Sequence, residues 1–280
     1  MSPNIQILAE RTNVDLRDPT YFRIQYTETI DGRFVKSIRY LRVLPDGRPD
    51  FEDNVPLTKC WLEGSTTNIP FPELPSGEWD IVDIIRDEAT SCPIACNARS
   101  IEAMKINPWH PVSVDYFELE KNGQLTNGYV RIRRSDNLWV VRHSSSPIPM
   151  VMKISEFPFL NLESIRRETD VYRFIDGRDI APQFMAHVTE GGRIVGFLTA
   201  YVEDGTRPVV ERNDGACEDA LQKLHDVGLL HRDVHKGNFL MRLDGTATLI
   251  DFESAVPCPR HLKCFFDEEM RERKNSFWFE

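Results

Sequence analysis

The chain has 280 residues and a mass of 32.4 kDa, which is enough for one large domain, or for one domain with a smaller partner, to bury a full core without disulfides or metals. Its composition, 41% hydrophobic and 28% charged, excludes wholesale disorder. The formal net charge is −10, although residues 116–175 carry nine basic against seven acidic side chains. This balance disfavours broad coating of nucleic acid and leaves room for a local anion site.

No segment approaches the ~20 consecutive apolar residues of a membrane helix, and the first 20 residues are charged and lack an apolar core. We therefore predict neither a membrane span nor a secretory signal, and we expect a cytoplasmic protein. The cysteines form no zinc-type pattern with the histidines. Reduced thiols are the favoured interpretation, and a bridge between Cys92 and Cys96 is the weaker alternative.

The N-terminal part of the chain is predicted to be β-rich. Residues 21–26 alternate between apolar and polar side chains, Asp31-Gly32 predicts a turn, and residues 34–43 continue as a second strand. Residues 78–85 fit a strand or a helix. No chemical motif occurs in residues 1–111, so their role is left open.

From about residue 112, short candidate strands alternate with Gly and Ser clusters. Four of them are predicted at 115–119, 128–133, 138–141 and 150–154. The apolar spacing of residues 165–175 predicts a helix, and residues 193–202 predict another strand. A second helix is expected at about 217–227, with Asp214 as its N-cap and Gly228 as its C-terminal stop.

One segment carries a chemical pattern. His231-Arg232-Asp233 is followed by Asn238 five positions after the aspartate, and Asp251-Phe252-Glu253 comes next. The pattern resembles the catalytic loop and metal-binding turn of the protein-kinase-like superfamily. The resemblance implies that the Asp233 carboxylate accepts the proton of an acceptor hydroxyl or orients that hydroxyl. It also implies that the Asn238 amide and the Asp251 carboxylate, which are hard oxygen ligands, hold magnesium on nucleotide phosphates.

Two upstream residues fit the same resemblance. Lys153, in Val151-Met152-Lys153-Ile154, resembles the lysine that holds phosphates, and Glu168 is its expected helical partner, with Glu163 as the competitor. No G-x-G-x-x-G motif precedes Lys153. Glu253 replaces the glycine of the D-F-G motif, which makes this turn similar to that of choline kinases and aminoglycoside phosphotransferases. Glu253 is therefore a candidate metal ligand, with a solvent-facing side chain as the alternative.

Further runs resemble small kinase-like proteins of fungi over about 60% of the chain. These runs are Arg167–Tyr172, Ile180–Pro182, Gly192–Phe197 and Leu224–Asp233. Only 27 residues follow Glu253, which leaves no room for the peptide-holding elements of a protein kinase, so we expect a small-molecule acceptor.

The resemblance implies an α+β, bilobal protein-kinase-like fold with a reduced C-lobe, preceded by the β-rich region. The kinase-like domain is predicted at 112–280, with a five-stranded N-lobe sheet and one helix to about residue 198, a hinge at about 199–204 and a helical C-lobe at about 205–280. The implied function is an ATP- and Mg²⁺-dependent phosphotransferase, with a possible place in fungal secondary metabolism. Its cofactor-binding residues would be Lys153, Asn238, Asp251 and Glu203, the last in the adenine-facing hinge.

Two other functions stay open on the same fold. The first is a non-phosphoryl transfer, such as aminoacyl-tRNA-dependent synthesis of an arginine-containing cyclodipeptide, for which a basic patch would face the tRNA. The arginines available for that patch are Arg131, Arg133, Arg134, Arg142, Arg166 and Arg167. The second is a nucleotide-binding pseudokinase without activity, which the complete set of Lys, Glu, Asp, Asn and Asp disfavours.

Overall fold

The computed structural model describes residues 4–12, 18–45, 71–90, 92–101, 104–124, 137–206, 208 and 210–278. The chain is a mixed α and β protein that divides into two compact units, Met1–Ala103 and Met104–Glu280. The division lies earlier than the predicted boundary at 111/112. The reason is local: Ile106 belongs to the hydrophobic core of the second unit, and the backbone N–H of Trp109 donates to His187 of that unit at 3.2 Å.

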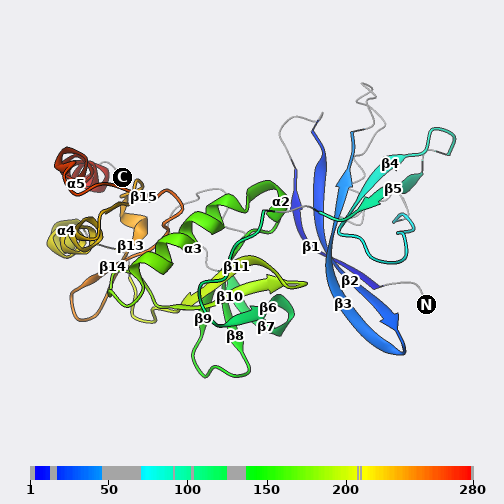
Figure 1. Ribbon diagram of the computed structural model, residues 1–280, viewed down its shortest axis with the longest axis horizontal. Helices are drawn as coiled ribbons and strands as arrows, with labels where there is room; N and C mark the ends of the chain where they lie inside the picture. The colour runs from blue at the N-terminus through cyan, green and yellow to red at the C-terminus, as the bar shows by residue number, and fades with distance from the viewer. Residues whose placement is uncertain are drawn as a thin grey trace. The chain divides into compact units, whose positions relative to one another are not determined.

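The described residues of the first unit form a sheet in the order β1-β2-β3-β4-β5, drawn in blue and cyan in Figure 1. Its strands are β1 (Asn4–Arg11), β2 (Thr20–Ile30), β3 (Arg33–Val43), β4 (Ile81–Arg86) and β5 (Pro93–Arg99). The predicted hairpin is confirmed: β2 and β3 pair from Thr20↔Val43 to Ile30↔Arg33. Its turn residues Asp31 and Gly32 have φ angles of 50° and 76°, which suits a tight hairpin turn.

Alternation of side chains builds the core of this first unit. Phe22, Ile24 and Tyr26 occupy every second position of β2 and are almost fully buried. They pack with residues of β3 and β4 and with the buried Trp79. The segment that fitted either a strand or a helix forms β4. Cys92 and Cys96 are both free thiols, so the alternative bridge between them does not form.

The second unit begins with a six-stranded sheet in the order β6-β10-β11-β9-β8-β7. Its strands are β6 (Ser113–Asp115), β7 (Leu119–Gln124), β8 (Leu138–His143), β9 (Met150–Ile154), β10 (Phe184–Glu190) and β11 (Arg193–Ala200). The predicted strands at 138–141, 150–154 and 193–202 form β8, β9 and β11, whereas β6, β7 and β10 are not among the predicted strands. β6 lies at the edge of the sheet, parallel to β10.

The strand predicted at 115–119 is wrong, whereas the predicted strand at 128–133 lies outside the described residues. A short 3₁₀ turn, η1 (Tyr116–Glu118), separates β6 from β7. The side chain of Asp115 accepts a hydrogen bond from the Phe117 N–H at 3.0 Å, and the side chain of Glu118 accepts one from the Asp115 N–H. This capping box closes a turn where an extended strand was expected.

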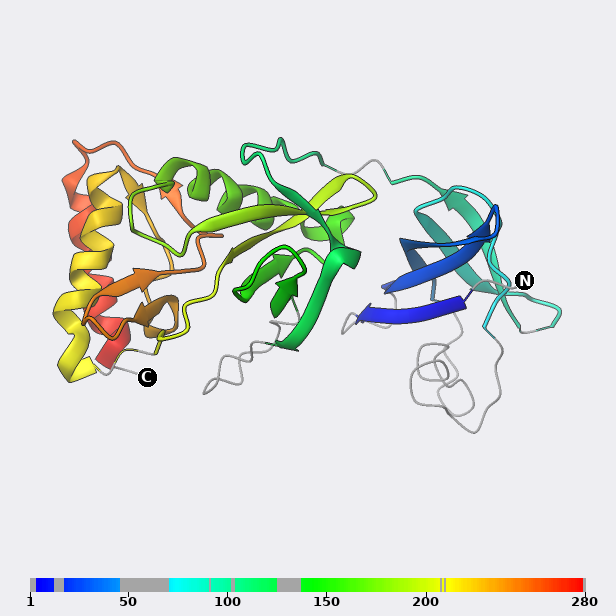
Figure 2. The same cartoon turned by 90° about the horizontal axis from the view of Figure 1, so that it is seen from below.

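Helices flank this sheet and follow it. Within the second unit, α3 (Glu163–Ile175) comes after the one-turn helix α2 (Pro158–Asn161), and α4 (Val210–Asp226) and α5 (Lys263–Trp278) lie side by side (Figure 1 and Figure 2). The smaller elements are β12 (Leu229–Leu230), η2 (Lys236–Asn238), β13 (Phe239–Met241), β14 (Ala247–Leu249) and β15 (Val256–Pro257). β13 pairs with β14, and β12 pairs with β15.

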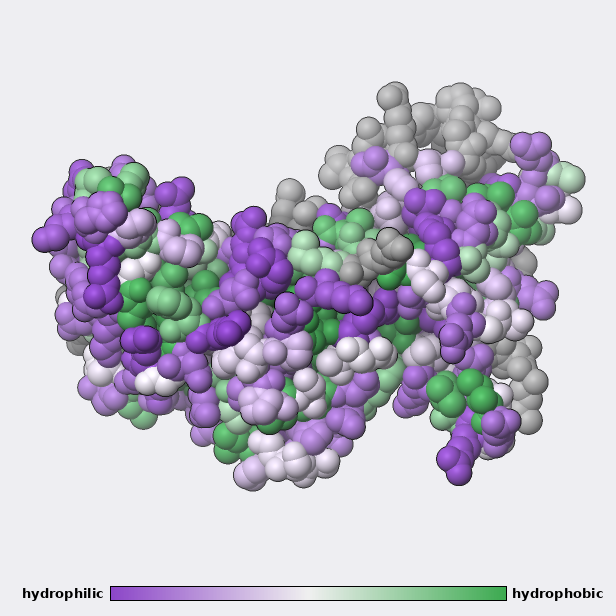
Figure 3. All heavy atoms as spheres, viewed as in Figure 1, coloured by the Kyte–Doolittle hydropathy of each residue, from purple (hydrophilic) through white to green (hydrophobic). Residues whose placement is uncertain are grey.

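The predicted N-cap of the second helix is wrong. α4 starts at Val210, so Asp214 lies inside the helix, where its carboxylate accepts from the buried Arg273 of α5 at 2.6 Å. Hydrophilic side chains predominate over α4 and α5 in Figure 3, with hydrophobic patches between them. No helix among the described residues is long and apolar enough to cross a membrane.

Candidate functional site

The site is built around a buried lysine on the middle of the sheet. Lys153 lies on β9 between β8 and β11, and it is 7% exposed. Its Nζ donates to Oε2 of Glu168 at 2.6 Å and to Oδ1 of Asp251 at 2.6 Å. Three predicted residues, separated by up to 98 positions in the sequence, therefore meet at one ammonium group.

The helix α3 carries Glu168 to this lysine on its apolar face. Ile165, Glu168, Tyr172 and Ile175 are spaced three or four residues apart and all four are buried. A buried carboxylate needs partners, and Glu168 has two: Lys153 and the backbone N–H of Phe252, which donates at 3.2 Å. Glu163, the competing candidate for the partner of Lys153, instead forms ion pairs with Arg166 and Arg167.

The charges around Lys153 decide its protonation. Burial lowers the pKa of Lys153, but the combined effect of the Glu168 and Asp251 carboxylates is larger, and its pKa is raised above the ordinary value. Burial raises the pKa of Glu168, and Lys153 partly offsets this rise. The ammonium of Lys153 therefore stays charged at neutral pH.

The loop between β12 and η2 carries Asp233. The ring of His231 is buried, and its Nε2–H donates to the carbonyl of Ile250 at 3.0 Å, which ties the loop to the residue before Asp251. Burial lowers the pKa of His231, so the ring is neutral at neutral pH. Arg232 takes a φ of +67°, an uncommon conformation for a non-glycine residue.

A carboxylate from the last helix holds this strained loop. Glu269 of α5 is 3% exposed, and it accepts from the N–H groups of His231 at 3.1 Å and Arg232 at 2.6 Å. His225 of α4 lies 2.7 Å from the same carboxylate. Sequence reasoning missed Glu269. The sequence gives one indication of its role. Glu269 and Arg273, the two buried charged residues of α5, are four positions apart and so lie on the same face of the helix.

Asp233 and Asn238 are joined directly. The Asn238 Nδ2 donates to the backbone carbonyl of Asp233 at 2.9 Å and to its Oδ2 at 3.0 Å. The pKa of Asp233 is lowered, with the adjacent His235 ring as the largest cause. Asp233 is therefore an ionised carboxylate, with its side chain 43% exposed, and it can accept a proton from a group in front of it.

The turn at residues 251–253 brings two more carboxylates near Lys153. Asp251 has a φ of +66°, and the ring of Phe252 is fully buried against Tyr172 and His231. This packing fixes the turn. Glu253 is 48% exposed and its Oε2 lies 3.7 Å from Lys153 Nζ. Glu253 thus faces the charged cluster and is also open to solvent.

The oxygen atoms of this cluster suit a hard cation. Asn238 uses its amide nitrogen on Asp233, which leaves its Oδ1 directed away from that contact. Asp251 uses one oxygen on Lys153. Oxygen ligands of this kind suit magnesium. Among the described residues, no group of three or more His, Cys, Asp or Glu side chains is close enough to hold a metal by itself.

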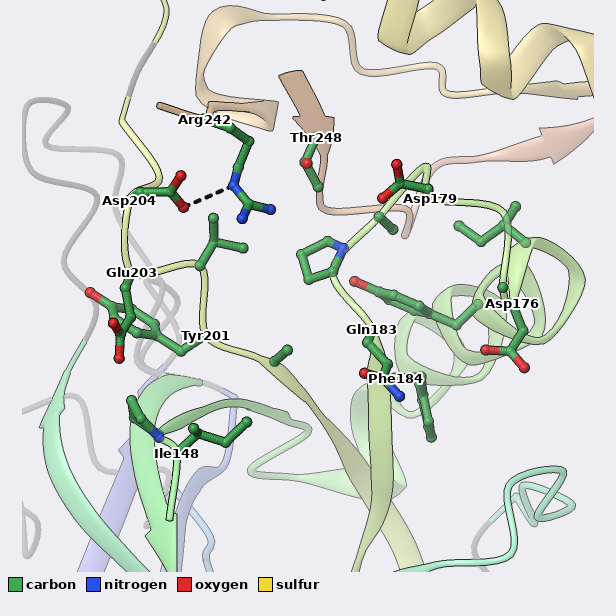
Figure 4. Close-up of a pocket in the computed structure, with 18 of the residues that line it drawn as sticks. Ile148, Asp176, Asp179, Gln183, Phe184, Tyr201, Glu203, Asp204, Arg242 and Thr248 are labelled. Carbon is green, nitrogen blue, oxygen red and sulfur yellow. Dashed lines mark hydrogen bonds and ion pairs between the residues drawn. The ribbon is translucent and has the colours of Figure 1, made fainter. Parts of the chain in front are cut away.

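A cavity of about 1020 Å³ lies between the loop after α3, the segment after β11 and the β13–β14 turn. Figure 4 shows Arg242 hydrogen-bonded to Asp204 in the lining of this cavity, with Gln183, which precedes β10, and Phe184 of β10 also in the lining. The lining includes Glu203, the predicted hinge residue, but none of Lys153, Glu168, Asp233, Asn238 or Asp251. Glu203 is exposed, and the structure gives it no contact with the charged cluster.

The basic patch proposed for tRNA is only partly described. Arg131, Arg133 and Arg134 lie outside the described residues. Arg166 contacts Glu163 and Asp170, and Arg167 contacts Glu163, so nearby carboxylates balance these two charges.

No family model and no curated protein matches this chain.

Proposed function

We propose that the second unit is an ATP- and magnesium-dependent phosphotransferase with a bilobal, kinase-like fold and a small-molecule acceptor. One observation carries the proposal: Lys153 Nζ lies 2.6 Å from both Glu168 and Asp251, while Asn238 binds Asp233 on the adjacent loop. Phosphoryl transfer depends on positioning and on neutralising charge, and this set of residues supports both.

The arrangement of elements supports the kinase-like fold. A sheet with one long helix, α3, precedes a smaller part built from α4, α5 and short hairpins. Lys153 and Glu168 come from the former, whereas Asp233, Asn238 and Asp251 come from the latter. The resemblance of Asp251-Phe252-Glu253 to choline kinases and aminoglycoside phosphotransferases supports a small acceptor.

Each residue then has a role in a balanced step. The acceptor hydroxyl attacks the γ-phosphorus of ATP, its proton passes to the Asp233 carboxylate, and the bond from that phosphorus to the bridging oxygen breaks. ADP leaves with the electron pair of that bond. Lys153 neutralises phosphate charge, and Glu168 holds the lysine in place.

The cluster also fits the metal that this chemistry uses. Asn238 and Asp251 would hold magnesium, with Glu253 as a further oxygen ligand. When bound, magnesium supplies positive charge for the phosphate oxygens. Asp251 would then serve as a metal ligand, and Lys153 would neutralise phosphate charge.

Binding of ATP tests the proposal. The substitution Asp251→Asn removes a charged metal ligand, so we expect magnesium-dependent affinity for ATP to fall by about 10–100-fold, the range for losing a metal-site interaction. Titration calorimetry with ATP, with and without magnesium, measures this. Asp219→Asn, at an exposed position of α4, is the matched control and should bind as the wild type does.

Equal ATP affinity in the wild type and Asp251→Asn would contradict the metal role. No magnesium-dependent ATP binding by the wild type, together with a melting temperature raised by aminoacylated tRNA, would favour the transfer from tRNA instead.

A further inference from the structure

The ring of His235 lies beside Asp233 in a fixed orientation. Its Nδ1 accepts a hydrogen bond from the backbone N–H of Gly237 at 3.0 Å. A ring nitrogen that accepts from an N–H carries no proton itself, so the proton of the neutral imidazole is on Nε2. That Nε2 lies 3.6 Å from Oδ2 of Asp233. The backbone thus selects the tautomer that directs an N–H group at Asp233.

Gly237 provides the space for this ring. A Cβ atom at position 237 would lie 2.7 Å from Cε1 and 2.9 Å from Nδ1 of His235. The backbone of Gly237 is not in the left-handed region, so its φ angle does not require glycine. The close approach of the His235 ring does.

The two contacts of the Asp233 carboxylate meet at the same oxygen. Oδ2 accepts from Nδ2 of Asn238 at 3.0 Å and faces Nε2 of His235. Neither of these two contacts uses Oδ1. With Oδ2 held from two sides, Oδ1 is the oxygen left to receive a proton from an acceptor.

We propose that His235 is a positioning residue, which orients the Asp233 carboxylate so that Oδ1 faces the acceptor hydroxyl. The inference rests on the proposed phosphotransferase activity. A distance of 3.6 Å is long for a hydrogen bond, and contacts of this kind shorten when the reacting complex forms. A second group that fixes the orientation of a base is a recurrent arrangement in enzyme sites.

His235 also has a purely structural role to be separated from this one, because its Nδ1 caps the short helix η2. Two variants separate the roles. In His235→Asn, the amide oxygen can still cap the Gly237 N–H, but the side chain is too short to reach Asp233. In His235→Gln, the amide nitrogen can take the place of Nε2 and reach Asp233.

Magnesium-dependent ATP hydrolysis, with water as the acceptor, is the assay. We expect kcat of His235→Asn to fall by about 10-fold or more, within the 10–100-fold range for losing an orienting partner. KM for ATP and the melting temperature should stay near wild-type values, and His235→Gln should recover most of kcat. Gly237→Ala, which displaces the ring, should lower kcat as His235→Asn does.

Full kcat in His235→Asn would overturn the inference and leave His235 as a helix cap. A second result tests the route through Asp233: combined with Asp233→Asn, the His235→Asn change should cause no additional loss. Losses that multiply in the double variant would show that His235 acts independently of Asp233, and would overturn the inference.

Nitrogen NMR of the imidazole separates this inference from the proposed function. The wild type should show His235 protonated at Nε2, with a signal that moves in Asp233→Asn. A wild type with that signal but without ATP hydrolysis would contradict the phosphotransferase and support the His235–Asp233 contact. Protonation at Nδ1 would overturn the inference whatever the activity.

Discussion

At the scale of single residues, the site depends on a lysine and a glutamate that are both removed from water. Lys153 is 7% and Glu168 is 2% exposed, so each ion has a desolvation cost that its partners must offset. Asp251, with a side chain that is 37% exposed, can be solvated when the lysine is absent. The buried Glu168 carboxylate cannot be solvated in this way. The Lys153–Glu168 pair can therefore be tested by its effect on stability, without any substrate.

The substitution Lys153→Met should lower the free energy of unfolding by about 3–5 kcal/mol, because it leaves the Glu168 charge buried without a counter-ion. Adding Glu168→Gln should restore most of that loss, since a neutral amide needs no counter-ion. Urea denaturation of the wild type, both single variants and the double variant measures the coupling. Two losses that simply add would show that the residues do not stabilise each other.

At the scale of elements, the last helix is part of the site although it carries none of the predicted residues. Burial would raise the pKa of Glu269, but its hydrogen bonds from His225 and from the N–H groups of Arg232 and His231 outweigh burial and lower it. Glu269 is therefore an ionised carboxylate beneath the loop that carries Asp233. It compensates for the unfavourable φ of Arg232.

Removing this carboxylate should destabilise the loop. Glu269→Ala leaves the buried donors of His225 and His231, and the partly buried N–H of Arg232, without this acceptor. We expect a loss of about 2–6 kcal/mol of unfolding free energy, from 1–3 kcal/mol for each of the two buried groups. Glu268→Ala, at the exposed neighbouring position of the same helix, should cost less than about 0.5 kcal/mol. Thermal and urea unfolding measure both, and equal losses would contradict the role given to Glu269.

The same elements show what the sequence could predict. Asp233, Asn238 and Asp251 stand out because their spacing is fixed by one loop and one hairpin, and so is local in the chain. The helix α3 follows from its apolar spacing. Glu269 is one of four acidic residues in α5. Which of the four is buried depends on how α5 packs against α4, and the sequence alone does not predict this. Asp214 resembles an N-cap in the local sequence, because its actual partner, Arg273, lies 59 positions away and local sequence gives no sign of the contact.

At the scale of the whole molecule, the described residues of each unit form a hydrophobic core, and these two cores have no residue in common. One is formed by residues of β2, β3 and β4 in the first unit, and the other joins α3, α4 and the short hairpins of the second. A separate core is the physical basis for a separate cooperative transition. All the residues of the proposed site belong to the second unit.

Scanning calorimetry should therefore show two unfolding transitions, and ATP with magnesium should raise only one of them. A ligand at 100 times its Kd stabilises the folded state by about 2.7 kcal/mol, which corresponds to about 5–10 °C for a unit of this size. The variant Ile24→Ala opens a cavity in the core of the first unit. It should lower only the melting temperature of the transition that the ligand does not shift, and so assign that transition to the first unit. ATP without magnesium is the control. If there is a single transition, and both the ligand and Ile24→Ala shift it, the two cores unfold together. In that case a change confined to one core alters the stability of both.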